Sequence, residues 1–155
     1  MTKLTQKQYN QLPENKWCGK IVPAFSDLSD IRSFGKSCSF GKSCSFGKSC
    51  SFGESCSFGE SCSFGKFCSF GEFCSFGKSC SFGESCSFGK FCKVENGKIL
   101  KRKYILAFYG FGSRNGSVYA FDTKKGIYIR CGCWAGTLAE FKERVKAVYK
   151  NTLFA

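Results

Sequence analysis

Residues 34–93 read FGKSCS FGKSCS FGKSCS FGESCS FGESCS FGKFCS FGEFCS FGKSCS FGESCS FGKFCK. This is one hexapeptide, Phe-Gly-(Lys/Glu)-(Ser/Phe)-Cys-Ser, in ten consecutive copies. A period of six matches neither the α-helix nor the heptad repeat. It is typical of a β-solenoid, in which each six residues make a short strand and a corner. The repeat therefore predicts a mainly β fold built from stacked coils.

The position of a residue in the hexapeptide predicts whether it is buried. Phe and the Cys two positions before the next Phe have the same parity along a strand, so their side chains point to one side. We expect Phe and Cys to point inward, and Ser, Lys and Glu to point outward. Gly tolerates backbone angles that other residues resist, and we therefore expect it to make the corner.

The hexapeptide resembles the repeat of the left-handed parallel β-helix family. The family pattern is an aliphatic residue, a small or acidic residue, two variable positions, a small residue and a variable position. Here Phe stands where the family has Leu, Ile or Val, which implies a wider or differently packed coil. The resemblance implies three hexapeptides in each coil, so that residues 18 apart stack at the sheet spacing of about 4.8 Å.

Stacking of residues 18 apart would arrange the charged side chains in columns. The columns are Lys36, Glu54, Glu72 and Lys90; Lys42, Glu60 and Lys78; and Lys48, Lys66 and Glu84. Most neighbours in a column are opposite in sign, but an exposed ion pair contributes less than about 1 kcal/mol. The columns therefore either help to fix the register or form a solvated mixed-charge face.

Three copies carry Phe in place of the second variable residue. These exposed rings are candidates for a dimer or partner contact, and they are Phe67, Phe73 and Phe91. Phe73 and Phe91 are 18 residues apart and are expected to stack.

We divide the chain into an N-terminal cap (1–33), the solenoid (34–93) and a C-terminal module (94–155). Val22, Leu28 and Val94 keep the six-residue phase, so the outer coils are degenerate copies, as the capping of an exposed coil end requires. In the cap, a short helix is expected from Thr5 to Leu12, before Pro13. Three large side chains are expected to cover the first coil: Trp17, Ile21 and Phe25.

The C-terminal module is predicted to be β-β-β-α. Strands are expected over 103–110, 117–121 and 127–131, with turns at 113–116 and 124–126. Thr137 is a good N-cap, and Glu140 three residues later completes a capping box before a helix over 138–149. The apolar face of this helix would carry Leu138, Phe141, Val145 and Val148.

The module also resembles the tails of small, uncharacterised proteins from phages and prophages, in which a hexapeptide-rich front precedes the tail. The matching residues are Gly112-Ser113-Arg114, Arg130-Cys131-Gly132-Cys133 and Gly136-Thr137-Leu138-Ala139-Glu140-Phe141. The resemblance implies a phage or prophage source and this fold, but it brings no activity.

The chain contains no His. This excludes Ser-His-Asp and Cys-His nucleophile pairs, a His general base and His-containing zinc sites. Many hexapeptide β-helix proteins are acyltransferases whose catalytic base is His, so we expect that this chain is not an enzyme. Cys131-Gly132-Cys133 lacks a second pair at zinc-ribbon spacing, and we expect neither a metal nor a cofactor.

No run of about 20 apolar residues occurs, and residues 1–10 lack the apolar core of a signal peptide. We therefore expect a cytoplasmic protein without membrane contact, which for a phage protein means the bacterial host cytoplasm. In that compartment the 13 Cys would be reduced and the inward ones would act as small hydrophobes. In an oxidising compartment, Cys side chains of neighbouring coils would be close enough for disulfides.

The positive charge is concentrated in one part of the chain. The formal net charge is +13, and residues 93–155 carry 13 basic and 4 acidic side chains. Aromatic residues interleaved with this charge could bind a nucleotide or nucleic acid, or they could simply pack a core. Candidate ligand-binding residues are Lys101, Arg102, Lys103, Arg114, Arg130 and Trp134. The alternatives are a basic surface without a specific ligand and, for the two isolated arginines, a structural ion pair or carbonyl clamp.

Together these patterns predict a non-enzymatic binding protein. A rigid solenoid with a basic module would bind a host protein or an anionic ligand, and an inhibitor of a host defence system would fit. The alternative is a structural or self-assembling protein, in which solenoid ends or the exposed Phe rings join copies into a homo-oligomer.

Overall fold

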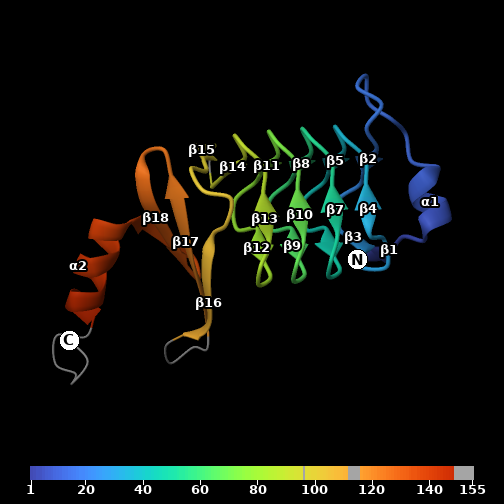
Figure 1. Cartoon of the computed structure of the whole chain (residues 1–155). Coiled ribbons are helices and arrows are strands. Elements are labelled where there is room, and N and C mark those ends of the chain that lie inside the picture. The colour runs from blue at the N-terminus through green and yellow to red at the C-terminus, as the bar shows by residue number, and fades with distance from the viewer. Residues whose placement is uncertain (96, 112–115, 149–155) are drawn as a thin grey trace. The chain divides into compact units, whose positions relative to one another are not determined.

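The computed structural model describes residues 1–95, 97–111 and 116–148. The fold is mainly β, and its parallel stacked strands form a β-solenoid of about four turns (Figure 1). The chain divides into two compact units, Met1–Tyr104 and Ile105–Ala155, and each is described by itself.

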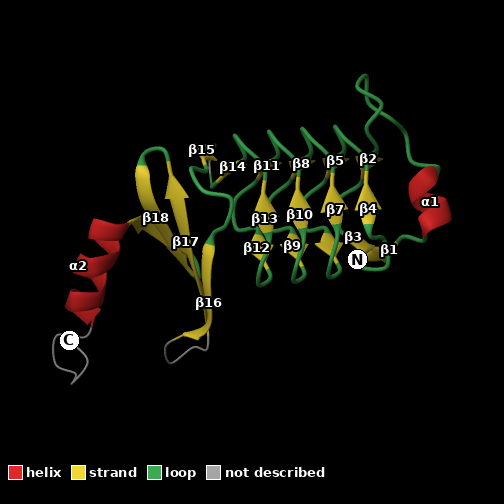
Figure 2. Ribbon diagram, viewed as in Figure 1, coloured by secondary structure: helices red, strands yellow, loops and turns green. Residues whose placement is uncertain are grey.

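Each hexapeptide of the solenoid contributes a strand of two residues, the Ser that ends one copy and the Phe that begins the next (Figure 2). These strands are β4 (Ser33–Phe34), β5 (Ser39–Phe40), β6 (Ser45–Phe46), β7 (Ser51–Phe52), β8 (Ser57–Phe58), β9 (Ser63–Phe64), β10 (Ser69–Phe70), β11 (Ser75–Phe76), β12 (Ser81–Phe82) and β13 (Ser87–Phe88). The flanking strands are β1 (Thr2–Lys3), β2 (Ile21–Val22), β3 (Ser26–Leu28), β14 (Lys93–Val94) and β15 (Lys98–Ile99).

The strands form three sheets, in the orders β1-β3-β6-β9-β12, β13-β10-β7-β4 and β15-β14-β11-β8-β5-β2. Repeat strands pair in parallel with partners 18 residues away, as in Ser39 with Ser57. This register confirms three hexapeptides in each coil. Val22 and Leu28 pair with Phe40 and Phe46, so the coil does begin before the perfect copies. The left-handed sense of the coil stays an expectation from the resemblance.

The corner of each coil is made by the fourth residue of the hexapeptide. From Ser37 to Phe91 this Ser or Phe has φ between 56° and 61°, in the left-handed region. Its amide N–H is thereby turned to the next coil, where it donates to the carbonyl of the third residue, as Ser37 does to Glu54 at 2.7 Å. Our expectation that Gly makes the corner for its backbone freedom was wrong.

Gly is instead required by the close approach of neighbouring coils. A Cβ on Gly53 would lie 2.6 Å from the amide nitrogen of Lys36 in the coil below, and one on Gly59 would lie equally close to that of Lys42. Backbone atoms at this distance cannot give way as the end of a flexible side chain can. Gly35, in the first coil, has no atom within 4 Å of that position.

Phe rings fill the centre of the solenoid, and all ten that begin a repeat are buried. Rings 18 residues apart stack with centroids 4.7–5.3 Å apart, from Phe34 and Phe52 to Phe70 and Phe88. Rings six apart meet edge to face, as Phe52 and Phe58 do at 5.0 Å. Both geometries are favourable for aromatic quadrupoles, which explains how Phe rings can fill the interior of the coil.

The ten repeat Cys residues line the same interior, also buried. From Cys56 to Cys92, each thiol donates a hydrogen bond of 3.2–3.4 Å to the carbonyl of a Gly 21 residues earlier, beginning with Cys56 and Gly35. The predicted inward pattern of Phe and Cys is therefore confirmed. Cys also joins each coil to the one below, which its size alone did not predict.

The N-terminal end is closed by β1, which pairs with β3, and by α1 (Gln6–Asn10), which begins with the capping box of Thr5 and Gln8. Tyr9 is buried, with its ring 5.4 Å from that of Phe34 at right angles. The predicted helix is present, but the side chains expected to cover the first coil are not buried. Exposed fractions are 64% for Trp17, 42% for Ile21 and 50% for Phe25.

After the last coil, the chain reverses direction and covers the end of the solenoid. Strand β15 pairs antiparallel with β14, and the amide of Phe88 donates to the carbonyl of Lys103 at 2.8 Å. These bonds occupy backbone groups that a further coil would otherwise use.

The second unit is an antiparallel sheet in the order β16-β17-β18-β19, followed by a helix. Its elements are β16 (Leu106–Phe111), β17 (Gly116–Thr123), β18 (Gly126–Cys131), β19 (Trp134–Thr137) and α2 (Leu138–Val148). The three predicted strands are present, and β19 was missed because it has only four residues and no alternation. The Thr137–Glu140 capping box is confirmed, with the Thr137 amide donating to the Glu140 carboxylate at 2.6 Å. Within the described residues, no helix is long and apolar enough to cross a membrane.

Candidate functional site

Three consecutive cations lie near the end of the first unit, at Lys101, Arg102 and Lys103, and all are exposed. Their backbone is anchored through the bond from Phe88 to the Lys103 carbonyl. The Lys103 ammonium lies 5.5 Å from the centroid of the Tyr104 ring, a cation–π distance. The segment therefore presents positive charge beside an exposed aromatic ring on a fixed backbone.

Arg130 has a different environment from these cations. It lies on β18 opposite Tyr119 of β17, is only 6% exposed, and stacks its guanidinium 4.6 Å from the centre of the Tyr119 ring. The Tyr119 ring in turn meets that of Tyr109 edge to face at 6.3 Å. In this position the guanidinium packs against the surface of the sheet.

Trp134 lies at the start of β19, opposite Cys131. Its ring is half-buried between two side chains of α2, with the Phe141 ring 5.7 Å away and the Arg144 guanidinium 5.8 Å away. Arg130 pairs with Ala135, the neighbour of Trp134, so Arg130 and Trp134 point to opposite faces of the sheet. The sheet does not bring these two candidates together. Arg114, like the turn predicted at 113–116, falls outside the described residues.

The exposed Phe residues occupy two different corners of the solenoid. Phe73 and Phe91 stack with centroids 5.2 Å apart and are 54% and 43% exposed. Phe67 is 59% exposed but belongs to another column, between Ser49 and Ser85. The expected stack is therefore confirmed as a pair, and Phe67 stands apart from it.

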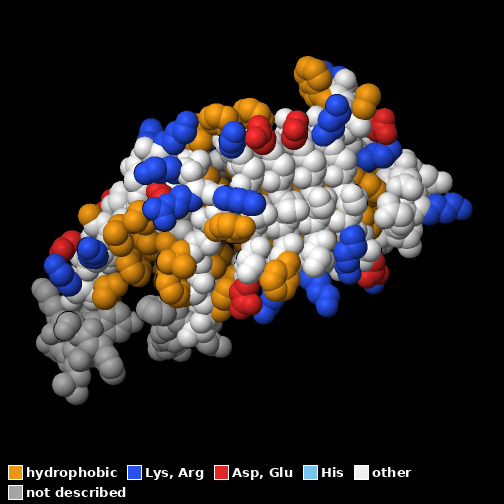
Figure 3. Space-filling view, viewed as in Figure 1, with side chains coloured by type: hydrophobic (Ala, Val, Ile, Leu, Met, Phe, Trp, Pro, Cys, Tyr) orange, Lys and Arg blue, Asp and Glu red, His pale blue; other side chains and the backbone are white. Residues whose placement is uncertain are grey.

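Of the predicted charge columns, one neighbouring pair forms a close ion pair, from the Lys66 ammonium to the Glu84 carboxylate at 2.8 Å. Both side chains are more than half exposed, so the pair adds little stability. Lysines and glutamates are interspersed on the surface of the solenoid in Figure 3.

All thirteen Cys are free thiols, and those at residues 18 and 133 are exposed. A hydrogen bond with the Cys62 thiol, together with burial, raises the pKa of Cys44. The same two causes, with Cys68 as the partner, raise the pKa of Cys50. These two thiols therefore stay protonated and unreactive at neutral pH. At the other end of the solenoid, hydrogen bonds with the Cys68 and Cys74 thiols lower the pKa of Cys86 and Cys92, respectively. Among the described residues, no cluster of His, Cys, Asp or Glu could hold a metal ion.

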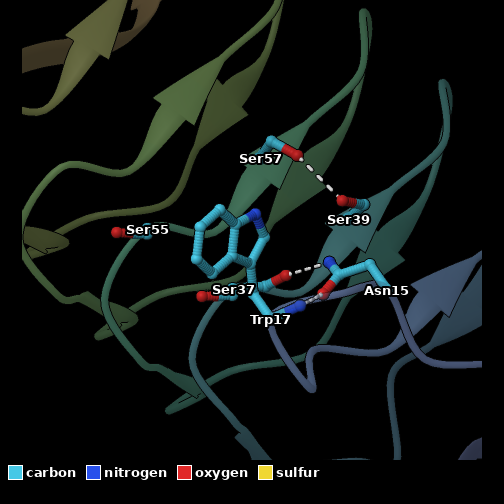
Figure 4. A pocket seen from close by; sticks show the side chains of 6 residues that line it. All are labelled: Asn15, Trp17, Ser37, Ser39, Ser55 and Ser57. Carbon is cyan, nitrogen blue, oxygen red and sulfur yellow. Dashed lines mark hydrogen bonds between the residues drawn. The ribbon is translucent and has the colours of Figure 1, made fainter.

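The described residues also form an open recess that the sequence did not predict (Figure 4). Its volume is about 490 Å³, and its walls are Asn15, Trp17, Ser37, Ser39, Ser55 and Ser57. The indole lies among serines of the first repeat coils. The sequence signal was Trp17, a large aromatic outside the six-residue phase, which we interpreted as a cover for the coil end.

Comparisons with protein-family models, curated proteins and solved structures give no match for the chain. The site must therefore be interpreted from its own chemistry.

Proposed function

We propose that this chain is a non-enzymatic binding protein whose basic C-terminal part binds an anionic ligand or an acidic surface of a host macromolecule. The observation that carries the proposal is the exposed segment Lys101–Lys103, within a region of 13 basic and 4 acidic residues. A row of exposed cations on an anchored backbone attracts phosphate or carboxylate groups and releases their counterions on binding.

Further exposed cations of the second unit support the same proposal, namely Lys124, Lys125, Lys142, Arg144 and Lys146. The buried Arg130 would act indirectly, by holding Tyr119 and the sheet in place. The repeat and tail motifs resemble phage and prophage proteins, which favours a partner in the bacterial host cytoplasm and a role such as the inhibition of host defence.

The test uses fluorescence anisotropy to measure the binding of a labelled oligodeoxythymidylate over a range of salt concentrations. Replacement of Lys101, Arg102 and Lys103 by Ala is expected to weaken binding at least about tenfold and to lower the salt slope by about 2, at roughly 0.7 for each phosphate contact of a single strand.

The matched control replaces Lys36, Lys42 and Lys48 by Ala, which removes the same charge from an exposed part of the solenoid. This control is expected to leave most of the affinity. Equal losses in both variants contradict a defined site, as does the absence of binding to both the oligonucleotide and inorganic polyphosphate at low salt.

The exposed pair of Phe73 and Phe91 favours a second candidate, a self-assembling solenoid. Exposed apolar patches mark interaction sites, and two stacked rings on a surface corner could join two copies of the chain. This candidate predicts a mass above that of the monomer in light scattering, falling to the monomer when Phe73 and Phe91 are replaced by Ser. A monomer before the replacement contradicts it.

A further inference from the structure

The loop that carries Trp17 is held in one conformation against the first coils. The Asn15 side chain accepts hydrogen bonds from the amides of Trp17 at 2.8 Å and Gly19 at 3.1 Å, and it donates to the carbonyl of Ser37 at 2.6 Å. Gly19 is buried, and a Cβ there would meet the Ser37 carbonyl. These bonds fix the backbone of the loop, which carries an indole that is 64% exposed.

An exposed indole held in this way contributes little to the core. The rings that close the first coil are Tyr9 and Phe34, and Trp17 is not among them. Lys16 places its ammonium 5.1 Å from the centre of the indole, a cation–π distance. An aromatic ring that lines a concave surface together with a few polar groups is typical of a small-molecule site.

The opposite wall of the recess is made of hydroxyl groups. Ser57 donates to Ser39 at 3.3 Å, which leaves lone pairs on Ser57 and a proton on Ser39 for a ligand (Figure 4). Ser37 and Ser55 supply two more hydroxyls from the corner of the same coils. The recess thus combines one apolar ring with a set of neutral donors and acceptors.

The charges near the recess nearly cancel. The corner residues before Ser37 and Ser55 are Lys36 and Glu54, the next two in the column are Glu72 and Lys90, and Lys16 adds one ammonium beside the indole. A polyanion gains little net attraction from three positive and two negative side chains, in contrast to the three consecutive cations of Lys101–Lys103. The recess therefore favours a neutral ligand.

We propose that this recess binds a neutral saccharide, with one pyranose ring stacked on Trp17 and its hydroxyls bonded to the serines. A pyranose has an apolar C–H face and an equatorial rim of hydroxyls, which matches an indole opposite a serine wall. Phe73 and Phe91 follow Ser37 and Ser55 along the same corner, so a longer chain meets a second aromatic surface there. This site is separate from the basic segment and does not depend on it.

The experiment is calorimetric titration with three neutral hexasaccharides, of β-1,4-glucose, β-1,4-N-acetylglucosamine and α-1,4-glucose. At least one is expected to bind with little salt dependence. Trp17→Ala is expected to weaken that binding at least about tenfold, because a stacking surface is lost. Phe67→Ala removes a similarly exposed ring on another corner and is expected to have no effect.

A second matched pair tests the hydroxyl wall. Ser39→Ala with Ser57→Ala is expected to weaken binding several-fold. Ser45→Ala with Ser63→Ala removes an identical 3.3 Å hydroxyl pair from another sheet and is expected to leave binding unchanged.

Three results overturn the proposal. The first is no binding of any hexasaccharide at millimolar concentration, and the second is binding that Trp17→Ala leaves intact. The third is a different occupant, recognised as Trp17-dependent binding of oligodeoxythymidylate or as a dimer that Trp17→Ala converts to monomer.

Discussion

In the solenoid, the same interior contacts recur from coil to coil, whereas the described contacts of the C-terminal sheet differ from one another. Phe52 stacks on Phe34 as Phe70 stacks on Phe52, and each thiol has its Gly carbonyl. In the sheet, Arg130 stacks on Tyr119, and the helix begins with the capping box of Thr137 and Glu140. A destabilising substitution in the repeat is therefore expected to disturb both neighbouring coils. A substitution in the sheet is expected to have only a local effect.

The largest loss of stability is expected when one of the stacked Phe rings is removed, which leaves a cavity in the core. Phe58→Ala removes a ring that stacks on Phe40 and Phe76, and it is expected to lower the free energy of unfolding by about 3–5 kcal/mol. Denaturant unfolding measured by circular dichroism tests this. The exposed Phe67→Ala is the control, and a similar loss in both variants would show that the stacks do not dominate.

A smaller effect is expected from Gly53→Ala, which places a methyl group against the backbone of the coil below. Overpacking of this kind costs about 1–3 kcal/mol. Gly35→Ala is the matched control, because the same repeat position is open in the first coil. The comparison uses thermal unfolding of both variants, and equal melting temperatures would refute the role of close coil approach.

Interior thiols with a raised pKa, such as Cys44 and Cys50, give the solenoid a pH dependence. Because the pKa of Cys44 is raised in the folded state, the unfolded thiol loses its proton first, from about pH 8.5 upward. The stabilisation is therefore complete below that pH and is lost above it, by up to about 1.4 kcal/mol per pH unit for one thiol.

Urea unfolding at a series of pH values above neutrality measures this slope. Cys44→Ala is expected to have a shallower slope than the parent protein. An unchanged slope in that variant would assign the pH dependence to other groups.

The smallest effect is expected in the sheet unit, from its capping box. Thr137→Ala removes the acceptor of the Glu140 amide and is expected to cost about 1 kcal/mol. The emission of Trp134, in a variant with Phe in place of Trp17, reports on this unit. If Thr137→Ala also shifts the unfolding midpoint of the solenoid, measured by circular dichroism, a substitution in the sheet does not have only a local effect.

The solenoid could be predicted from the sequence because Phe and Cys recur ten times with the same six-residue spacing and on the same side of a strand. The role of Gly could not, because backbone freedom and close approach both favour Gly and only coordinates separate them. The left-handed backbone of Ser37 and its equivalents could not be predicted either, because Ser is common in turns of every type.

The candidate sites were predicted unevenly. Charge is additive along the chain, so the basic segment at Lys101–Lys103 could be located from composition. Stacking of Phe73 on Phe91 followed from the 18-residue period. The burial of Arg130 and the recess at Trp17 depend on contacts between distant residues, which no local pattern records.

The register of 18 residues has a consequence for changes in chain length. Insertion or deletion of three hexapeptides adds or removes one whole coil and returns every later residue to its own sheet. Insertion of a single hexapeptide keeps Phe and Cys inside but moves all later residues one sheet around the coil. The interior tolerates both changes. A single hexapeptide inserted between Ser55 and Phe73, however, moves the Phe73–Phe91 pair to another corner, out of the column of Ser37 and Ser55 beside Trp17. The hexapeptide is thus the unit of folding, and the coil is the unit of surface pattern.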